Sequence, residues 1–409
     1  MKKNTLFGLL AILALTISSC KQQKKEQLAE NSIAKVVPED LKWSERMALS
    51  EIHRFPDAAY LDFRKTPGWS YTNGLVLQAV SKVYEQTKNQ KLFDYIYDYG
   101  DQMIEEDGTI NTYRLPTYNL DMIKSGDPIF YLYQKKKEPR FLMAMDTLHK
   151  QLEGQPMTSE GGYWHKKRYP FQMWLDGVFM AEPFHAKYAK AFMNEDDAKK
   201  VYDKIVLQFD LIQKYNHDPK TGLYFHGWDE SREQRWANKE TGLSQHFWSR
   251  GMGWYGMALV DVLDHLPEEH PGYDRIKGYI KGYAEAIVKY QAENGTWYQV
   301  LDLPNREGNY LEATGTSMFT YMLAKGANKG YLDQEYMEYA EKAYAGILKT
   351  FITVEDNGVV SLNRCCAVAG LGGNPYRDGS FEYYIGEKIR ANDPKGTGPF
   401  IMASVELNQ

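Results

Sequence analysis

The residues with the clearest capacity for chemistry are two aspartates. Asp176 lies in the stretch QMWLDGVFM at 172–180, which is otherwise almost entirely apolar. Burial strips water from a carboxylate and raises its pKa, and a second carboxylate close by raises it further. Asp121, in the segment NLD at 119–121, is the natural second group. Such a pair could keep one acid protonated near neutral pH and ready to donate, although Asp176 could instead only cap its helix.

A second group of residues combines positive charge with aromatic rings. Arg250 lies between Trp248 and Trp254. A guanidinium can hold a carboxylate by two parallel hydrogen bonds, and an indole can stack on a sugar ring. The combination is typical of a site for an acidic sugar, although a cation–π contact or a salt bridge in the core would use the same residues.

Basic residues in two long loops could complete such a site. His165 and Lys166 begin the run HKKR, and His226 is flanked by aromatic residues in YFHGWD. These side chains could bind a sugar carboxylate or polarise a water, so His226 joins Asp176 and Asp121 as a candidate to activate one. The alternatives are a solvated charge run at HKKR and a structural histidine at position 226.

The segments that must position these groups have the apolar spacing of helices. Val201, Ile205, Phe209 and Ile212, for example, form one stripe with a period of 3.6 residues. About twelve such segments occur, beginning near residues 41, 71, 91, 119, 138, 171, 195, 248, 274, 313, 333 and 397. Twelve helices in hairpin pairs predict an all-α fold, a closed (α/α)6 toroid with six inner and six outer helices. An open solenoid is the alternative, but no fixed sequence period supports it.

The unusual polar and aromatic clusters fall at the start of every second helix. They are WSYTNG at 69–74, NLD at 119–121, WLDG at 174–177, WSRG at 248–251, EATGT at 312–316 and GTGPF at 396–400. In a toroid, alternate helices form the inner ring and their N-termini meet at one mouth. We therefore expect the clusters to converge on a single pocket there, lined by the long loops.

Composition excludes several classes of protein. The chain has 409 residues, a formal net charge of −5, 43% hydrophobic and 25% charged residues, which is ordinary for a soluble globular protein. A mildly acidic chain is a poor candidate for binding nucleic acid. The aromatic content of 9 Trp, 31 Tyr and 17 Phe suits a carbohydrate ligand, or simply a Tyr-rich core.

We expect neither a cofactor nor a metal. The segment 251–256 matches G-x-G-x-x-G, but no strand leads into it and bulky aromatic residues fill the positions that a pyrophosphate must approach. The nine histidines include no H-E-x-x-H pattern, and the adjacent Cys365 and Cys366 lack zinc spacing. Adjacent cysteines also cannot easily pair with each other, so the domain must be held together by its core.

The first twenty residues resemble a bacterial lipoprotein signal peptide. A basic start precedes an apolar run at 6–17, which is too short to span a bilayer permanently, and the segment ISSC ends at Cys20. Cys20 would become the lipidated first residue, although a plain secretory signal is the alternative. Residues 21–39 are then a polar tether, and 40–409 a single domain. We expect an exported lipoprotein, periplasmic or membrane-anchored, that touches the membrane only through its lipid.

Together the motifs resemble glycoside hydrolase family 105, which contains unsaturated rhamnogalacturonyl and glucuronyl hydrolases on a six-hairpin toroid and is related to family 88. The resemblance runs from about Trp43 to the C-terminus. It is carried by YTNG at 71–74, NLD at 119–121, His165 eleven residues before Asp176, HGWD at 226–229, WSRGMGW at 248–254, AVAGLGG at 367–373 and KGTGPF at 395–400. Their order and spacing over most of the chain make the set specific.

The resemblance implies a role for each matched residue. Asp176 would be the general acid/base, and Asp121 the second carboxylate that assists it. The subsite for the terminal sugar would be lined by His165, Lys166, His226, Trp248, Arg250 and Trp254, with Tyr71 and Asn73 at its edge.

The implied reaction acts on the double bond that polysaccharide lyases leave in a terminal uronic acid. A protonated Asp176 would donate to C4, water would add at C5, and the hemiketal would open and release the rest of the chain. The expected substrate is an unsaturated oligosaccharide, by analogy galacturonyl-rhamnose from rhamnogalacturonan. Two other functions compete with this one: a polysaccharide lyase on the same toroid, and a lipid-anchored protein that binds glycans without cleaving them.

Overall fold

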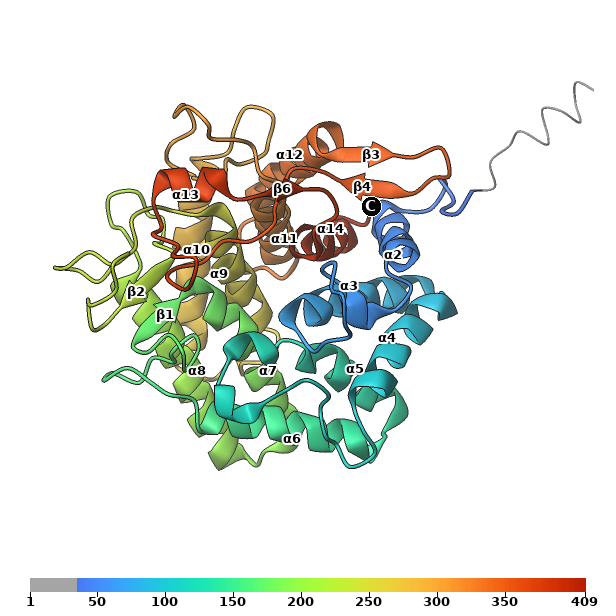
Figure 1. The fold of residues 1–409 in the computed structure, drawn as a ribbon, viewed down its shortest axis with the longest axis horizontal. Coiled ribbons are helices and arrows are strands. Elements are labelled where there is room, and N and C mark those ends of the chain that lie inside the picture. Colours follow the sequence, from blue (N-terminus) through green and yellow to red (C-terminus); the bar gives the residue numbers. More distant parts are fainter. Residues whose placement is uncertain (1–34) are drawn as a thin grey trace, which may run out of the picture.

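The computed structural model describes residues 35–409, in which twelve long helices form a closed ring (Figure 1). The inner helices are α3 (Tyr71–Thr87), α5 (Gly126–Lys136), α7 (Leu175–Phe192), α9 (Ser249–Val262), α11 (Ala313–Asn328) and α14 (Pro394–Glu406). The outer helices are α2 (Trp43–Arg54), α4 (Gln90–Met103), α6 (Pro139–Glu153), α8 (Glu195–Tyr215), α10 (Tyr273–Val288) and α12 (Glu335–Thr350). Inner and outer helices alternate along the chain, so the predicted all-α (α/α)6 toroid is confirmed.

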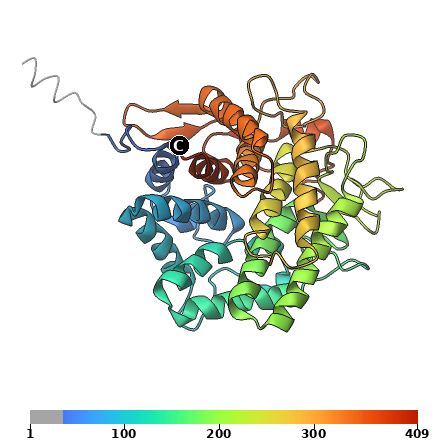
Figure 2. The same cartoon turned by 180° about the vertical axis from the view of Figure 1, so that it is seen from behind.

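Contacts between neighbouring inner helices close the ring. Helix α3 packs on α5, α7 on α9, α9 on α11 and α11 on α14, and α14 returns to α3. Between α5 and α7, the 3-10 turn η3 (Leu120–Met122) supplies contacts to α7. Seen from behind, the colours follow one another around the ring, and the dark red α14 lies beside the blue α2 (Figure 2).

Most residues of the inner helices are buried. All residues of α9, Ser249–Val262, are buried. Close packing there requires glycine: a Cβ at Gly253 would lie 2.7 Å from Met318, and one at Gly256 would lie 2.9 Å from Tyr283. The glycines of the G-x-G-x-x-G match therefore serve helix packing.

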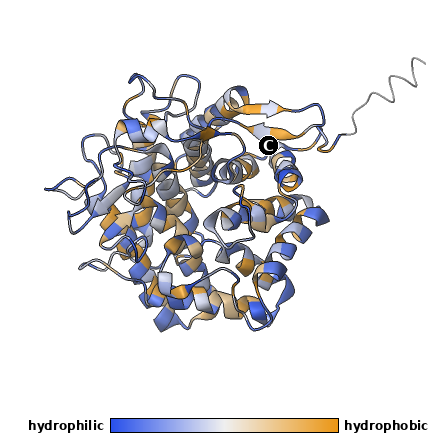
Figure 3. Cartoon of the chain, in the orientation of Figure 1, coloured by the Kyte–Doolittle hydropathy of each residue, from blue (hydrophilic) through white to orange (hydrophobic). Residues whose placement is uncertain are grey.

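The outer helices are amphipathic. The predicted stripe on α8, Val201, Ile205, Phe209 and Ile212, is at most 8% exposed, and the opposite face of the helix carries charge. Figure 3 shows the same division across the molecule, with apolar residues gathered on the helices and hydrophilic ones on most of the connecting loops.

Three small antiparallel sheets lie in the connections. Strand β1 (Gln172–Trp174) pairs with β2 (Gly227–Asp229), β3 (Ile352–Val354) with β4 (Val360–Leu362), and β5 (Cys365–Cys366) with β6 (Ile389–Arg390). A short helix, α13 (Phe381–Gly386), and the 3-10 turns η1 (Ala58–Tyr60) and η2 (Leu115–Thr117) complete the connections. Strands of two or three residues are too short to produce an alternating pattern in the sequence.

The polar clusters do lie at the starts of the inner helices, with one difference from the prediction. Tyr71 is the first residue of α3, Asp176 is in the first turn of α7, and Arg250 is in the first turn of α9. The helix expected to begin near Asn119 begins instead at Gly126. Asp121 therefore lies on the separate turn η3.

Only the last part of the segment covered by the N-terminal predictions lies within the described residues. The predicted signal peptide at 1–20, with Cys20, lies outside the described residues, as does most of the tether at 21–39. At the end of that tether, Val37 is fully buried, and the Val36 N–H donates to the Asn357 carbonyl at 2.8 Å. The folded domain therefore includes residues before position 40. No helix within 35–409 is long and apolar enough to cross a membrane.

Candidate active site

A two-stranded sheet brings the predicted acid Asp176 beside His226. Strand β1 runs directly into α7, and β2 begins just after His226, with Trp174 paired to Gly227. The Leu175 N–H donates to the His226 carbonyl at 3.0 Å. As a result, Asp176 Oδ2 lies 3.2 Å from His226 Nε2, and the Asp176 side chain keeps only 13% of its surface exposed.

The second aspartate is held by the loop that carries His165 and Lys166. The Leu120 N–H donates to the His165 carbonyl at 3.2 Å, which fixes η3 against this loop. Asp121 Oδ1 lies 3.3 Å from His165 Nε2, and its Oδ2 accepts a hydrogen bond from Lys166 Nζ. His165 and Lys166, the two adjacent bases that begin the run HKKR, thus contact one carboxylate.

Aromatic rings connect the two aspartates. His165 stacks on Trp174, with ring centroids 4.7 Å apart and planes 21° from parallel. The edge of Trp174 meets His226 at 5.4 Å, and His226 meets Trp248 at 4.7 Å. On its other side, His226 Nδ1 lies 2.8 Å from the Tyr384 hydroxyl. The histidines are therefore held in fixed orientations in an apolar setting.

The electrostatics of Asp176 differ from the expectation. Burial raises the pKa of Asp176, but the electrostatic effect of the nearby imidazoles, chiefly that of His226, holds the net pKa below the usual value. The direction of the pKa shift of Asp176 is therefore opposite to the expected one.

His165 is neutral at physiological pH. Burial lowers its pKa to about 4, against the opposing effect of Asp121. A neutral imidazole can donate one hydrogen bond to Asp121 without adding charge to the site.

Arg250 is anchored through backbone and helix-capping contacts. Its guanidinium lies over Trp248, 4.7 Å from the ring centroid, and Nη1 donates to the Cys366 carbonyl. The Cys366 N–H donates to Glu312 at 2.8 Å, and the other oxygen of Glu312 caps α11 by accepting from the Gly315 N–H at 2.7 Å. Arg250 is only 1% exposed, and its Nε has no hydrogen-bond partner among the described residues.

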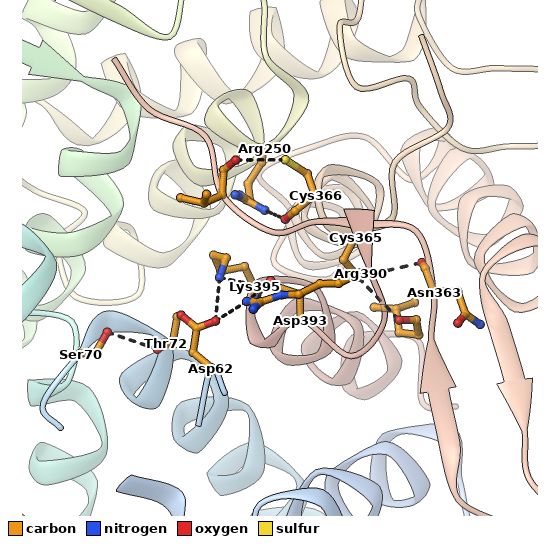
Figure 4. A network of polar contacts seen from close by, with 12 residues as sticks. Asp62, Ser70, Thr72, Arg250, Asn363, Cys365, Cys366, Arg390, Asp393 and Lys395 are labelled. Atoms are coloured by element: carbon orange, nitrogen blue, oxygen red, sulfur yellow. Dashed lines mark hydrogen bonds and ion pairs between the residues drawn. The ribbon is translucent and has the colours of Figure 1, made fainter. Parts of the chain in front are cut away.

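Figure 4 shows a cluster of charges in the same region as Arg250 and Cys366. The fully buried Asp393 accepts from Lys395 Nζ at 2.9 Å and from Arg390 Nε at 2.5 Å. Both cations also contact Asp62, from the loop between α2 and α3 (Figure 4). Burial raises the pKa of Asp393, but Lys395, Arg250 and Arg390 together hold it below its usual value.

Tyr71 and Trp254 form one group of the remaining predicted residues, and Asn73 stands apart from them. The edge of Tyr71 meets Trp254 at 6.1 Å, and Trp254 stacks on Phe179 at 4.9 Å. Burial, together with the charges of Asp62 and Asp121, raises the pKa of Tyr71 well above its usual value, so its phenol stays neutral. These rings therefore lie within electrostatic reach of the aspartates.

Asn73 is placed differently from the expectation. Its side chain is fully buried and donates to the Ala58 carbonyl at 2.6 Å, which ties α3 to η1. The expectation that Asn73 borders the sugar subsite is therefore not supported by its position.

An open pocket adjoins Asp121. It has a volume of about 650 Å³ and is lined by Thr112, Arg114, Thr117, Asn119, Asp121, Met122, Lys166, Lys167 and Arg168. This size is in the range of pockets that bind small molecules.

Tyr384 is a site residue that the sequence analysis missed. It lies on α13, within a loop, 158 positions after the His226 that it contacts. The consecutive tyrosines at 383 and 384, after the capping residue Ser380, were the only available signal.

Comparison with known proteins identifies the family of this chain. The model of Glycosyl Hydrolase Family 88 matches residues 43–409. The crystal structure of a family 105 glycoside hydrolase from Clostridium acetobutylicum ATCC 824 superposes with a TM-score of 0.85 at 43% identity, covering 90% of this chain and 99% of that one.

Two curated relatives are also similar in sequence. The unsaturated rhamnogalacturonyl hydrolase YesR of Bacillus subtilis is 26% identical over 309 residues, covering 73% of this chain and 80% of that protein. Protein Atu3128 of Agrobacterium fabrum is 40% identical over 191 residues, covering 45% of this chain and 82% of that protein. With the family model spanning the whole toroid, the chain belongs to the group of glycoside hydrolases described by family 88 and its relative family 105.

Proposed function

We propose that this enzyme removes a 4,5-unsaturated uronic acid from the non-reducing end of short oligosaccharides produced by polysaccharide lyases. The observation that carries the proposal is the pairing of Asp176 with His226 at 3.2 Å, in an aromatic setting at the start of an inner helix. The relative YesR, whose name assigns it this class of substrate, supports the same conclusion. We further propose unsaturated galacturonyl-rhamnose as the substrate.

The proton for the reaction is held between His226 and Asp176. In the free enzyme His226, 3.2 Å away, lowers the pKa of Asp176. A bound uronate brings a negative charge close to Asp176, which raises the proton affinity of that carboxyl. The proton can then pass from His226 Nε2 to Asp176, while Tyr384 keeps the imidazole in place by its contact with Nδ1.

The chemistry begins with transfer of that proton from Asp176 to C4 of the sugar. The C4=C5 electron pair forms the new C–H bond, and the positive charge at C5 is shared with the ring oxygen. Water adds at C5 and loses a proton to a carboxylate or imidazole of the site, giving a hemiketal. Opening of the hemiketal and then of the anomeric hemiacetal releases the remaining sugar as an alcohol, and no enzyme nucleophile attacks the anomeric carbon.

Arg250 and Lys166 are the candidates to orient the substrate carboxylate. Arg250 has a free Nε in the buried part of the site, and Lys166 reaches the site beside Asp121. Trp248 and Trp254 are each 1% exposed, with Arg250 over the first ring and Phe179 stacked on the second, so their role is to form the apolar wall behind the site.

The test is to supply unsaturated disaccharides made by pectin, ulvan and glycosaminoglycan lyases and to follow the absorbance of the conjugated double bond. We expect the absorbance to fall and, among substrates with an uncharged leaving sugar, to fall fastest with the galacturonyl-rhamnose disaccharide. Asp176→Asn should reduce kcat by about 10²- to 10⁴-fold while substrate binding is kept. Asp210→Asn is the control, because Asp210 accepts from Tyr279 at 2.8 Å on the outer layer, away from the site. A rise in absorbance with intact polysaccharide would instead identify a lyase.

We also propose that the enzyme is an exported lipoprotein attached through Cys20. The support is the sequence alone: a basic start, an apolar run and the segment ISSC ending at Cys20. Metabolic labelling with a radioactive fatty acid should mark the wild-type chain and not Cys20→Ser. Equal labelling of both chains would contradict the proposal.

A further inference from the structure

We infer that the pocket beside Asp121 is a subsite for an anionic group on the leaving part of the substrate. Arg114, Lys167 and Arg168 are then its specificity-determining residues. This inference rests on the proposed function and deepens it, because it states which oligosaccharides the enzyme prefers.

The lining of the pocket carries an excess of positive charge. Arg114, Lys166, Lys167 and Arg168 face a single carboxylate, Asp121, in a protein whose formal net charge is −5. Lys166 is already paired with Asp121. A concave surface with one sign of charge concentrates ligands of the opposite sign.

The other three cations have no acidic partner. Among residues 35–409, none of Arg114, Lys167 and Arg168 forms an ion pair, whereas the neighbouring Lys166 does. Lys167 lies 5.5 Å from the ring centroid of Tyr118, and Arg168 lies 4.9 Å from that of Tyr169. These contacts orient Lys167 and Arg168 and leave their charges available to a ligand.

The backbone that carries these cations is fixed. The Lys167 N–H donates to the Tyr118 carbonyl at 3.1 Å. The buried amide of Gln155 donates to the carbonyls of both Tyr118 and Trp164, at 3.0 and 2.8 Å. The two segments that line the pocket are therefore held together by the core, and the charges are preorganised.

The position of the pocket indicates that it binds the leaving part of the substrate and not the terminal uronate. The terminal uronate requires Asp176 and the buried Arg250, and neither of them lines this pocket. Asp121 belongs to both places, because it lines the pocket and contacts His165 of the aromatic cluster. A sugar chain that extends away from the terminal uronate at Asp176 therefore passes Asp121 and enters the pocket.

The anion that fits is a carboxylate or a sulfate ester. Either group can accept two parallel hydrogen bonds from a guanidinium, and the pocket offers two of them. A sulfate would be carried by the sugar next to the cleaved bond, whereas a carboxylate would belong to a second uronic acid further along the chain.

Three substrates separate these sources: a neutral unsaturated uronyl-rhamnose, the same disaccharide with a sulfate ester on the rhamnose, and a tetrasaccharide with a second uronate. The enzyme should have a higher kcat/KM for at least one anionic substrate than for the neutral one, and added salt should reduce the difference. The preferred anionic substrate identifies the source of the anion.

Variants of the pocket residues test whether the preference for anionic substrates arises in this pocket. Arg114→Gln, Lys167→Gln and Arg168→Gln should each lower kcat/KM for the preferred anionic substrate by roughly two- to fivefold, the range expected for an exposed charge pair. Turnover of the neutral disaccharide should not change. Lys220→Gln is the matched control, since Lys220 is an exposed cation that lies outside this pocket.

Two results would overturn the inference. One is equal kcat/KM for neutral and anionic substrates in the wild-type enzyme. The other is a loss in the variants that is the same for both kinds of substrate. In either case turnover of the neutral disaccharide still supports the proposed function, whereas inertness of all three substrates refutes the proposed function itself.

Discussion

Replacing Tyr384 by phenylalanine tests whether the proton donor depends on the orientation of His226. The substitution removes the hydroxyl that lies 2.8 Å from His226 Nδ1, between two side chains that are at most 1% exposed. Water cannot easily replace it, so Nδ1 loses its partner at a cost of about 1–3 kcal/mol. If the hydrogen bond is needed in the transition state, the same free energy predicts a fall in kcat of about fivefold to 160-fold.

The assay is steady-state hydrolysis of an unsaturated disaccharide over a range of pH, with urea denaturation measured in parallel. KM should change little, because Tyr384 acts through His226 and not on the sugar. The control is Tyr383→Phe, which removes a neighbouring hydroxyl that accepts from the Gly370 N–H at 3.0 Å. Both variants should lose stability, but only Tyr384→Phe should lose kcat. Wild-type kcat and an unchanged pH profile in Tyr384→Phe would refute the proposed role of His226 as the partner of the acid.

Three further predictions concern stability and reactivity. Asp393→Asn should reduce the free energy of unfolding at pH 7 by about 3–5 kcal/mol, because it removes the charge of the buried carboxylate that pairs with Lys395 and leaves that buried cation only Asp62, 3.2 Å away. The pKa of Asp393 is lowered by folding, so the wild-type advantage in urea should be present above pH 3.8 and shrink as the pH falls through the folded-state pKa; a gap that does not vary with pH would contradict this. Cys365 and Cys366 are buried free thiols with pKa values raised by burial, so a thiol reagent should label them in urea and not in the native enzyme, and rapid native labelling would count against the fold around them. Gly74→Ala should destabilise the enzyme by about 1–3 kcal/mol in the same urea assay, since its Cβ would lie 2.4 Å from a backbone oxygen at the α3–α5 crossing, and unchanged stability would argue against that close approach.

The sequence allowed the fold to be predicted because each helix signals itself locally. The stripe on α8 and its capping residue Asn194, whose side chain accepts from the Asp197 N–H at 3.0 Å, are visible without knowledge of the rest of the chain. The 3-10 turn that carries Asp121 was missed because a single turn has no periodicity.

The sequence allowed most residues of the site to be predicted, but not the direction of the pKa shift of Asp176. Burial of Asp176 follows from its apolar neighbours, but the direction of its pKa shift depends on His226, which β1 and β2 bring to 3.2 Å from positions 50 residues apart. Tyr384 is more distant still in the sequence. Contacts of this kind form when the ring closes, and no local sequence pattern predicts them.

That closure has a consequence for how the chain is made. Helix α14, residues Pro394–Glu406, packs on both α3 and α11, and the Gln409 carbonyl accepts from the Ser44 N–H at 3.2 Å. The helix that seals the toroid is therefore synthesised after the other eleven helices of the ring. Until α14 is made, the apolar flanks of α3 and α11 have no cover. The nascent chain must therefore remain open along that seam, where it is exposed to aggregation.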